Sequence, residues 1–278
     1  MRKPFLLTSL VIVSFYFFSK NQNPVENTSQ LTAAKVLSLR EAAVPNERKL
    51  LTRNNFEDYV QHLYRVIGLS SYKLDYEVFR LGMVGFFSLE REGALKNKDL
   101  VTIIDFSKAS TEKRFYTIDL RNQRLIHHTY VAHGRNTGQN MATEFSNTAH
   151  SNQSSLGFYV TGETYVGSKG YSLRLDGKEK SFNDKIRSRA VVIHAAEYAT
   201  EYWIKRYGRL GRSQGCPALP PDLSRKIIDT IKDKTAIFTY YPDENYLNAS
   251  RYLKEDDLFD KLDENPVQLA VDISQSQS

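Results

Sequence analysis

Apolar positions in the first third of the chain follow a helical period. Within residues 31–69 they recur at spacings of three and four, and a shorter pattern continues beyond. Asn54 or Asn55 is suited to start this helix, and Gly68 is suited to end it. We predict a small helical subdomain over residues 31–90, with its apolar stripe in the core rather than at a ligand site. The stripe comprises Phe56, Tyr59, Val60, Leu63, Tyr64 and Ile67, followed by Tyr76, Phe79, Gly82 and Phe86.

From residue 91 the apolar pattern changes to short runs rich in β-branched and aromatic residues, separated by polar turns. This pattern is typical of strands, and the first three runs predict a β-meander. The predicted strands are 99–106, 114–120, 125–132, 158–164, 171–175, 190–194 and 236–241, with one helix over 222–232 and a surface loop over 144–155. We therefore predict a mainly β, sandwich-like domain over residues 91–242. Residues 243–278, with an acidic cluster at 254–260 and a Ser/Gln-rich end, are expected to form a C-terminal tail.

The N-terminus begins with a charged and then apolar segment. Arg2 and Lys3 precede an apolar run over residues 5–18, the pattern of an export signal. As a helix this run would span about 21 Å, less than the roughly 30 Å of bilayer hydrocarbon. We interpret residues 1–20 as a signal peptide or an uncleaved membrane anchor, and residues 21–30 as a linker. The protein is then exported to the periplasm or cell envelope, with membrane contact only through this segment.

Composition and charge narrow the classes of partner. The 278 residues carry a formal net charge of +6, which suits a polyanionic neighbour such as anionic lipid or an acidic wall polymer. Lysines and arginines are spread along the chain without a dense basic run, so we do not expect nucleic-acid binding. The chain has one cysteine, Cys216, which cannot form a disulfide within the chain. Taken alone, a single thiol favours an inert, buried residue over a reactive one.

The surroundings of Cys216 reverse that preference. Residues 208–217 contain three glycines, two arginines and a proline, which predicts a shaped, exposed turn. Nearby arginines are expected to lower the pKa of the thiol. Because Pro217 lacks a backbone donor, an oxyanion hole at this turn would use the N–H groups of Gly215 and Cys216.

A thiol nucleophile also needs a base. The candidates are His62, His127, His128, His133, His150 and His194. His194 ends a predicted strand 22 residues before Cys216, and this position suits a partner of the thiol. His133 ends another strand in a polar turn suited to line a cleft. We expect no metal site, including one built from His127, His128 and His133.

The order of His before Cys separates known cysteine chemistries. Papain-like enzymes have the opposite order, and sortases carry a T-L-x-T-C sequence that is absent here. The stretch from Ser213 to Cys216 with the upstream His194 resembles the L,D-transpeptidase (YkuD) family, whose signature is a His followed by S/T-H-G-C. Residues 191–196 and 208–218 look like the murein L,D-transpeptidase subgroup, and the resemblance covers about residues 95–242.

The resemblance implies a YkuD-like β-sandwich domain in which Cys216 is the nucleophile and His194 the base. By the same resemblance, the Ala195 carbonyl would hold the His194 tautomer, and Ser213, Gln214 and Gly215 would support the oxyanion site. Two positions depart from the family: Gln214 replaces the usual His, and Pro217-Ala218 replaces an apolar residue and Arg. The predicted substrate-binding residues are His133, Arg209 and Arg212. Either arginine could supply the cation that the missing family arginine would have provided.

Three functions remain open on the sequence alone. The first is an L,D-transpeptidase that forms 3–3 cross-links between peptidoglycan stem peptides. The second is an L,D-carboxypeptidase or another cysteine hydrolase that trims those peptides, and the third is a catalytically silent wall-binding protein. Thioester chemistry requires no cofactor, and the sequence does not indicate an oligomeric state.

Overall fold

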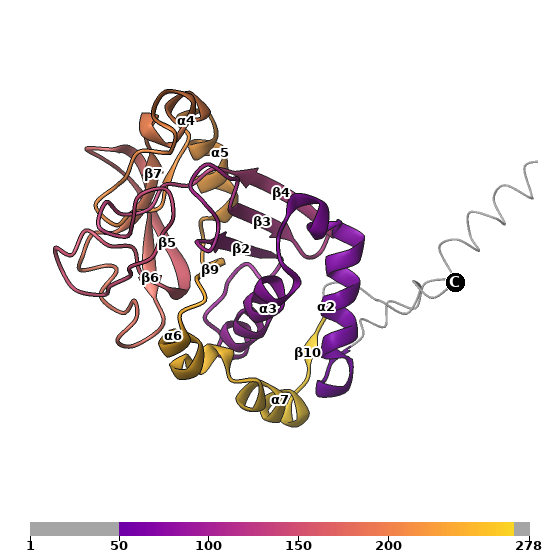
Figure 1. Ribbon diagram of the computed structural model, residues 1–278. Coiled ribbons are helices and arrows are strands. Elements are labelled where there is room, and N and C mark those ends of the chain that lie inside the picture. Colours follow the sequence, from indigo (N-terminus) through magenta and orange to yellow (C-terminus); the bar gives the residue numbers. More distant parts are fainter. Residues whose placement is uncertain (1–49, 270–278) are drawn as a thin grey trace, which may run out of the picture. The chain divides into compact units, whose positions relative to one another are not determined.

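The computed structural model describes residues 50–269 (Figure 1). The predicted signal or anchor, the linker and the first part of the helical subdomain lie outside these residues. None of the helices within 50–269 is long and apolar enough to cross a bilayer.

Eight strands form one continuous mixed sheet in the order β4-β3-β2-β9-β5-β6-β7-β8. Parallel pairs occur at β2–β9 and β7–β8, and the other neighbours are antiparallel. The mainly β fold class is confirmed, and so is the initial meander. The strands are β2 (Leu100–Asp105), β3 (Phe115–Asp119), β4 (Arg124–Thr129), β5 (Gly157–Gly167), β6 (Gly170–Gly177), β7 (Val192–Ala195), β8 (Ala218–Leu219) and β9 (Ala236–Tyr240).

Helices cover both faces of this sheet, which is why strand β2 is buried along its whole length. On one face, α3 (Tyr76–Arg91) packs against β2 and β9 (Figure 1). Gly85 permits this close approach, since a Cβ there would lie 2.0 Å from the ring of Phe158. On the other face, α5 (Pro221–Ile231) contributes Ile227, Ile228 and Ile231 to a second core cluster.

Helix α2 (Arg53–Ile67) carries the predicted apolar stripe into the α3 side of the core. Gly68 ends the helix at a φ of +70°, as predicted. The start differs: Thr52 is the N-cap residue, and its N–H donates to Asn55 Oδ1 at 2.9 Å. The remaining short elements in the first half of the chain are β1 (Leu50–Leu51) and the 3-10 turn η1 (Leu69–Tyr72).

Residues after 242 are folded as far as Leu269, so the prediction of a tail is wrong for this stretch. They form α6 (Glu244–Ala249), η3 (Arg251–Leu253), α7 (Glu255–Glu264) and β10 (Val267–Gln268). Strand β10 pairs with β1. Leu258 and Leu262 lie one helical turn apart on α7 and bury against the cluster of α2 and α3. Asp256, Asp257 and Asp260 of that helix are exposed, which made the segment look like a solvated tail.

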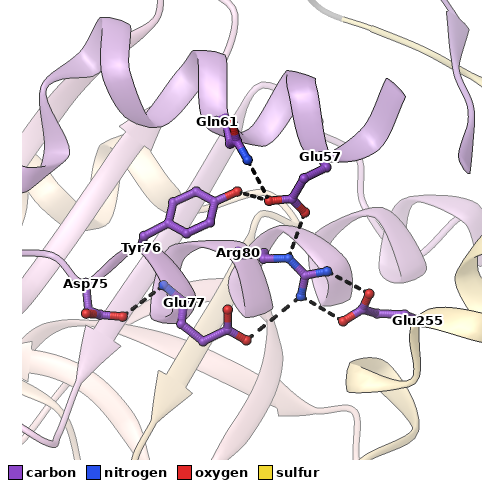
Figure 2. Close-up of polar contacts among 7 residues, drawn as sticks. All are labelled: Glu57, Gln61, Asp75, Tyr76, Glu77, Arg80 and Glu255. Carbon is purple, nitrogen blue, oxygen red and sulfur yellow. Dashed lines mark hydrogen bonds and ion pairs between the residues drawn. The ribbon is translucent and has the colours of Figure 1, made fainter. Parts of the chain in front are cut away.

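An ion-pair network joins these three helices (Figure 2). Arg80 of α3 donates two hydrogen bonds to the carboxylate of Glu255 on α7, each 2.7 Å long. Its Nε donates to Glu57 of α2 at 2.8 Å, and Tyr76 donates to the same carboxylate. The N-terminal helices and the C-terminal segment are therefore tied together on one side of the sheet.

Candidate active site

Strands β7 and β8 bring His194 and the Cys216 loop together. The two strands are parallel, with His194 opposite Ala218 and Ala195 opposite Leu219. Cys216 comes two residues before Ala218, so the loop lies beside the strand that carries His194. The predicted strand that carries His194 and the glycine-rich turn that carries Cys216 are separated in the sequence but meet at one edge of the sheet.

The Cys216 sulfur is half-buried and contacts backbone groups. The Val192 N–H points to Sγ at 3.4 Å, and the Ala190 carbonyl oxygen lies 4.0 Å from it. Within residues 50–269 no hydrogen bond joins Sγ to His194, which is common in ligand-free cysteine sites. Burial raises the pKa of the Cys216 thiol, while the Val192 N–H and the charges of Arg189 and Lys169 act in the opposite direction. The expectation of a lowered pKa was wrong because desolvation of the thiolate outweighs these favourable contacts.

His194 is buried, and one ring nitrogen has a defined partner. Nδ1 lies 2.8 Å from the carbonyl oxygen of Ala195. A carbonyl oxygen can only accept a hydrogen bond, so Nδ1 carries the proton and Nε2 of the neutral ring is an acceptor. Burial lowers the pKa of His194, partly offset by the bond to Ala195. The imidazole is therefore neutral at physiological pH, and its Nε2 has no hydrogen-bond partner in the part of the chain that the structure describes.

Ser213 braces the turn that leads to the cysteine. The Gly215 N–H donates to Ser213 Oγ at 3.0 Å, and this hydroxyl donates to the Cys216 carbonyl oxygen at 2.7 Å. Gly215 has a φ of +118°, which side-chain-bearing residues rarely adopt. The predicted oxyanion donor Gly215 N–H is thus already engaged. The Cys216 N–H has no partner within the described residues, and the Gln214 side chain is exposed.

Comparison with known proteins places this chain in a family. A family model described as the L,D-transpeptidase catalytic domain matches residues 70–240, more than half of the chain. The chain belongs to the L,D-transpeptidase catalytic domain family. The match begins earlier than the expected residue 95 because it includes α3, which forms part of the core beneath the sheet.

Solved structures of L,D-transpeptidases overlap with part of the chain. One from Mycobacterium smegmatis is 11% identical with a TM-score of 0.33, covering 51% of this chain and 59% of its own. One from Mycobacterium tuberculosis H37Rv is 13% identical with a TM-score of 0.34, covering 51% and 58%. One from Xylanimonas cellulosilytica is 15% identical with a TM-score of 0.29, covering 51% and 60%. The chain thus spans about three fifths of these solved chains. No curated protein matches it.

Two arginines of the Cys216 loop were expected to replace the cation that is usual in the L,D-transpeptidase family. Both donate hydrogen bonds to backbone carbonyl oxygens. Arg209 donates to the Leu210 carbonyl oxygen at 2.7 Å. Arg212 donates to the carbonyl oxygens of Arg135 and Gly138 at 2.9 and 3.1 Å. The cations whose charge acts on the thiol are instead Arg189 and Lys169. A role for Arg209 and Arg212 in substrate binding remains a prediction.

His133 lies in the interior rather than on a cleft. It is 1% exposed, and its Nδ1 accepts a hydrogen bond from the buried Arg114 at 2.7 Å. Burial and the Arg114 charge lower the pKa of His133 to about 3. The ring is therefore a neutral structural group, and the predicted substrate-binding role does not fit its position. Its neighbour Gly134 packs against Gly215, since a Cβ on Gly134 would lie 3.0 Å from the Gly215 Cα.

Sequence reasoning missed the segment that supports the Cys216 turn in this L,D-transpeptidase family member. The predicted surface loop, residues 144–155, contacts Gly215 through Ser154, whose Oγ donates to the Gly215 carbonyl oxygen at 3.2 Å. The same Oγ accepts the Gly134 N–H at 3.1 Å. Residues 146–155 are in turn held by Arg189, which precedes β7. The position of Arg189 just before β7, the strand that carries His194, was the signal available in the sequence.

No group of three or more His, Cys, Asp or Glu residues in the described part of the chain could hold a metal ion.

A cavity of about 520 Å³ is lined by residues near β4, by α4 (Glu201–Tyr207) and by the start of α5. Cys216 and His194 are not among its lining residues. The 3-10 turn η2 (Glu197–Ala199) leads into α4 and contributes Glu197 to the same cavity.

Proposed function

We propose that this protein is a cell-wall L,D-transpeptidase that forms a cysteine acyl-enzyme with peptidoglycan stem peptides. The observation that carries the proposal is the pairing of β7 with β8. This pairing sets Cys216 beside a neutral histidine whose Nδ1–H is fixed on the Ala195 carbonyl. A thiol nucleophile is activated by an adjacent base, and a third group orients that base. Cys216, His194 and the Ala195 carbonyl fill these three roles.

The reaction follows from these parts. Nε2 of His194 takes the proton of Cys216 Sγ as sulfur attacks the carbonyl carbon of the diamino acid at position three of a stem peptide. A C–S bond forms, and the oxygen of the tetrahedral intermediate takes the negative charge. The His194 proton then passes to the nitrogen of D-Ala, whose C–N bond breaks, leaving a thioester. An amine of a second stem attacks the thioester, His194 takes its proton, and the thiol is regenerated with a 3–3 cross-link.

The Cys216 N–H is the donor we assign to the developing oxyanion. It belongs to the residue that attacks, and it has no other partner in the described residues. Donors fixed in place before the reaction stabilise the charge that develops. Ser213 contributes by holding the turn through its bonds to Gly215 and Cys216.

The resting site holds a neutral thiol and a neutral imidazole. Burial moves the pKa of Cys216 upward and that of His194 downward, so the proton stays on sulfur until a substrate is present. His194 therefore acts as a general base during attack rather than as one half of a preformed ion pair.

The setting of the proposed reaction is the cell envelope. The apolar N-terminal segment would export the chain or anchor it, and stem peptides are its proposed partners. The chemistry uses no cofactor and involves no nucleic acid. With water in place of the amine, the same thioester would give L,D-carboxypeptidase activity.

The test uses a purified stem tetrapeptide ending in D-Ala, with and without a second tetrapeptide as acceptor. We expect release of D-Ala and a cross-linked dimer, both absent in Cys216→Ala and strongly reduced in His194→Gln. Tripeptide as the sole product with acceptor present would replace the transferase by the hydrolase. Intact substrate after long incubation with a folded enzyme would favour the silent wall-binding protein and contradict the proposal.

A further inference from the structure

Arg189 makes a set of contacts that the proposed reaction does not use. Its Nη1 donates to the Ser146 carbonyl oxygen at 2.7 Å and to Ser155 Oγ at 2.6 Å. Its Nη2 donates to Ser151 Oγ at 3.1 Å and to the Gln153 carbonyl oxygen at 2.7 Å. All four N–H bonds of the two terminal nitrogens thus hold one segment, residues 146–155. A planar guanidinium suits such a fixed array of acceptors, and a lysine does not.

That segment lies directly behind the nucleophile turn. A Cβ built on Gly215 would lie 2.8 Å from the Gln153 carbonyl oxygen and 3.5 Å from Arg189 Nη2. The Gln153 carbonyl that Arg189 holds is therefore also the group that limits the space at Gly215. Since Gly215 precedes Cys216, fixing Gln153 fixes the backbone from which the sulfur projects.

Arg189 also has no carboxylate partner among the described residues, in contrast to Arg187 two positions earlier. Arg187 pairs with Glu163 at 2.8 Å and with Asp176. The anionic forms that interact with the Arg189 charge are those of Tyr159 and Cys216. Burial raises the pKa of Tyr159 well above its ordinary value, so at physiological pH the thiolate of Cys216 is the anion that Arg189 can stabilise.

We propose that Arg189 is a positioning residue of the site, which clamps residues 146–155 behind Gly215 and places a positive charge, without a carboxylate partner in residues 50–269, beside Cys216. This inference rests on the proposed role of Cys216 as nucleophile. The ionisable groups around the sulfur are Arg189, Lys169 and Tyr198, with His194 on β7.

The test measures the pH dependence of Cys216 alkylation by iodoacetamide in the full chain, together with amide hydrogen exchange of residues 146–155. Arg189→Met is expected to raise the pKa of the thiol and to slow alkylation at neutral pH by roughly threefold to tenfold. Arg189→Lys keeps the charge, so the pH midpoint of its alkylation is expected to stay close to that of the wild type. Both variants are expected to exchange faster in 146–155, because neither can bridge the four acceptors.

Arg187→Met is the matched control, since it removes a neighbouring arginine whose partners lie away from the thiol. An alkylation profile of Arg189→Met that coincides with that of Arg187→Met would overturn the electrostatic role. Unchanged exchange of 146–155 in Arg189→Lys and Arg189→Met would overturn the clamp. Neither readout requires a wall substrate, so both can fail while the transpeptidase proposal stands, and the reverse also holds.

Discussion

Replacing Gly215 by alanine tests whether the Cys216 turn is as tightly constrained as its contacts indicate. The new Cβ would lie 2.8 Å from the Gln153 carbonyl oxygen, a backbone atom that Arg189 holds in place. Alanine must also adopt a φ near +118°. The backbone strain costs about 1–2 kcal/mol, and overpacking against a fixed group costs roughly 1–3 kcal/mol.

Gly208→Ala is the matched control. Gly208 has a φ of +72°, but no atom lies within 4 Å of its Cβ position. The control therefore loses only the backbone term, about 1 kcal/mol. For a domain of this size each kcal/mol shifts the melting temperature by roughly 2–4 °C. We expect Gly215→Ala to melt about 4–20 °C below the wild type and Gly208→Ala about 2–4 °C below it.

The assay is thermal unfolding by circular dichroism, followed by the rate of Cys216 alkylation at a temperature where both variants are folded. Gly215→Ala is expected to alter that rate because the displaced turn carries the sulfur, while Gly208→Ala is not. Equal melting temperatures and equal alkylation rates for the two variants would refute the tight packing of Gly215 against residues 146–155.

Three further predictions concern the ion-pair network, a buried carboxyl group and the active-site pair. Arg80→Met leaves the half-buried Glu255 without its partner and should lower the free energy of unfolding by roughly 1–3 kcal/mol; an unchanged urea midpoint would contradict this. Burial raises the pKa of Glu179. The stability that Glu179 contributes is therefore complete at a pH below the ordinary glutamate pKa and is lost as the pH rises through the pKa of the folded state. The stability of the wild type minus that of Glu179→Gln should therefore be larger at about pH 4 than at about pH 8, and a difference that grows with pH would contradict it. Because burial lowers the pKa of His194 and raises that of Cys216, kcat/KM should be half-maximal below pH 6.5, the ordinary histidine value. A rate that keeps rising between about pH 7 and pH 9 would show that the thiolate, not base-assisted attack, limits the reaction.

The sequence predicted best those features that depend on local pattern. Short runs of β-branched residues indicated the seven longer strands of the sheet, and the apolar face after Pro220 indicated α5. Gly68 was recognised as a helix end because left-handed backbone favours glycine at that position. The two-residue strand β8 was too short to produce a pattern of its own, although it is the strand that brings Cys216 beside His194.

Features that depend on distant contacts were not predictable in the same way. The acceptors of Arg189 come from 34 to 43 residues earlier in the chain, and no local signal marks them. His133 was assigned to a cleft because it follows a strand and precedes a polar turn. Its burial follows from Arg114, which approaches from the start of β3. Likewise, the direction of the Cys216 pKa depends on how deeply the turn is buried, and the composition of the turn does not encode that depth.

The central claim, that Cys216 is an acylatable nucleophile with His194 as its base, is tested most directly by the intact mass of the full chain after exposure to a carbapenem. These β-lactams acylate the active-site cysteine of the L,D-transpeptidase family. We expect a stoichiometric adduct that maps to Cys216, is absent in Cys216→Ala and forms more slowly in His194→Ala. A folded protein whose Cys216 reacts neither with the carbapenem nor with small alkylating reagents would contradict the account.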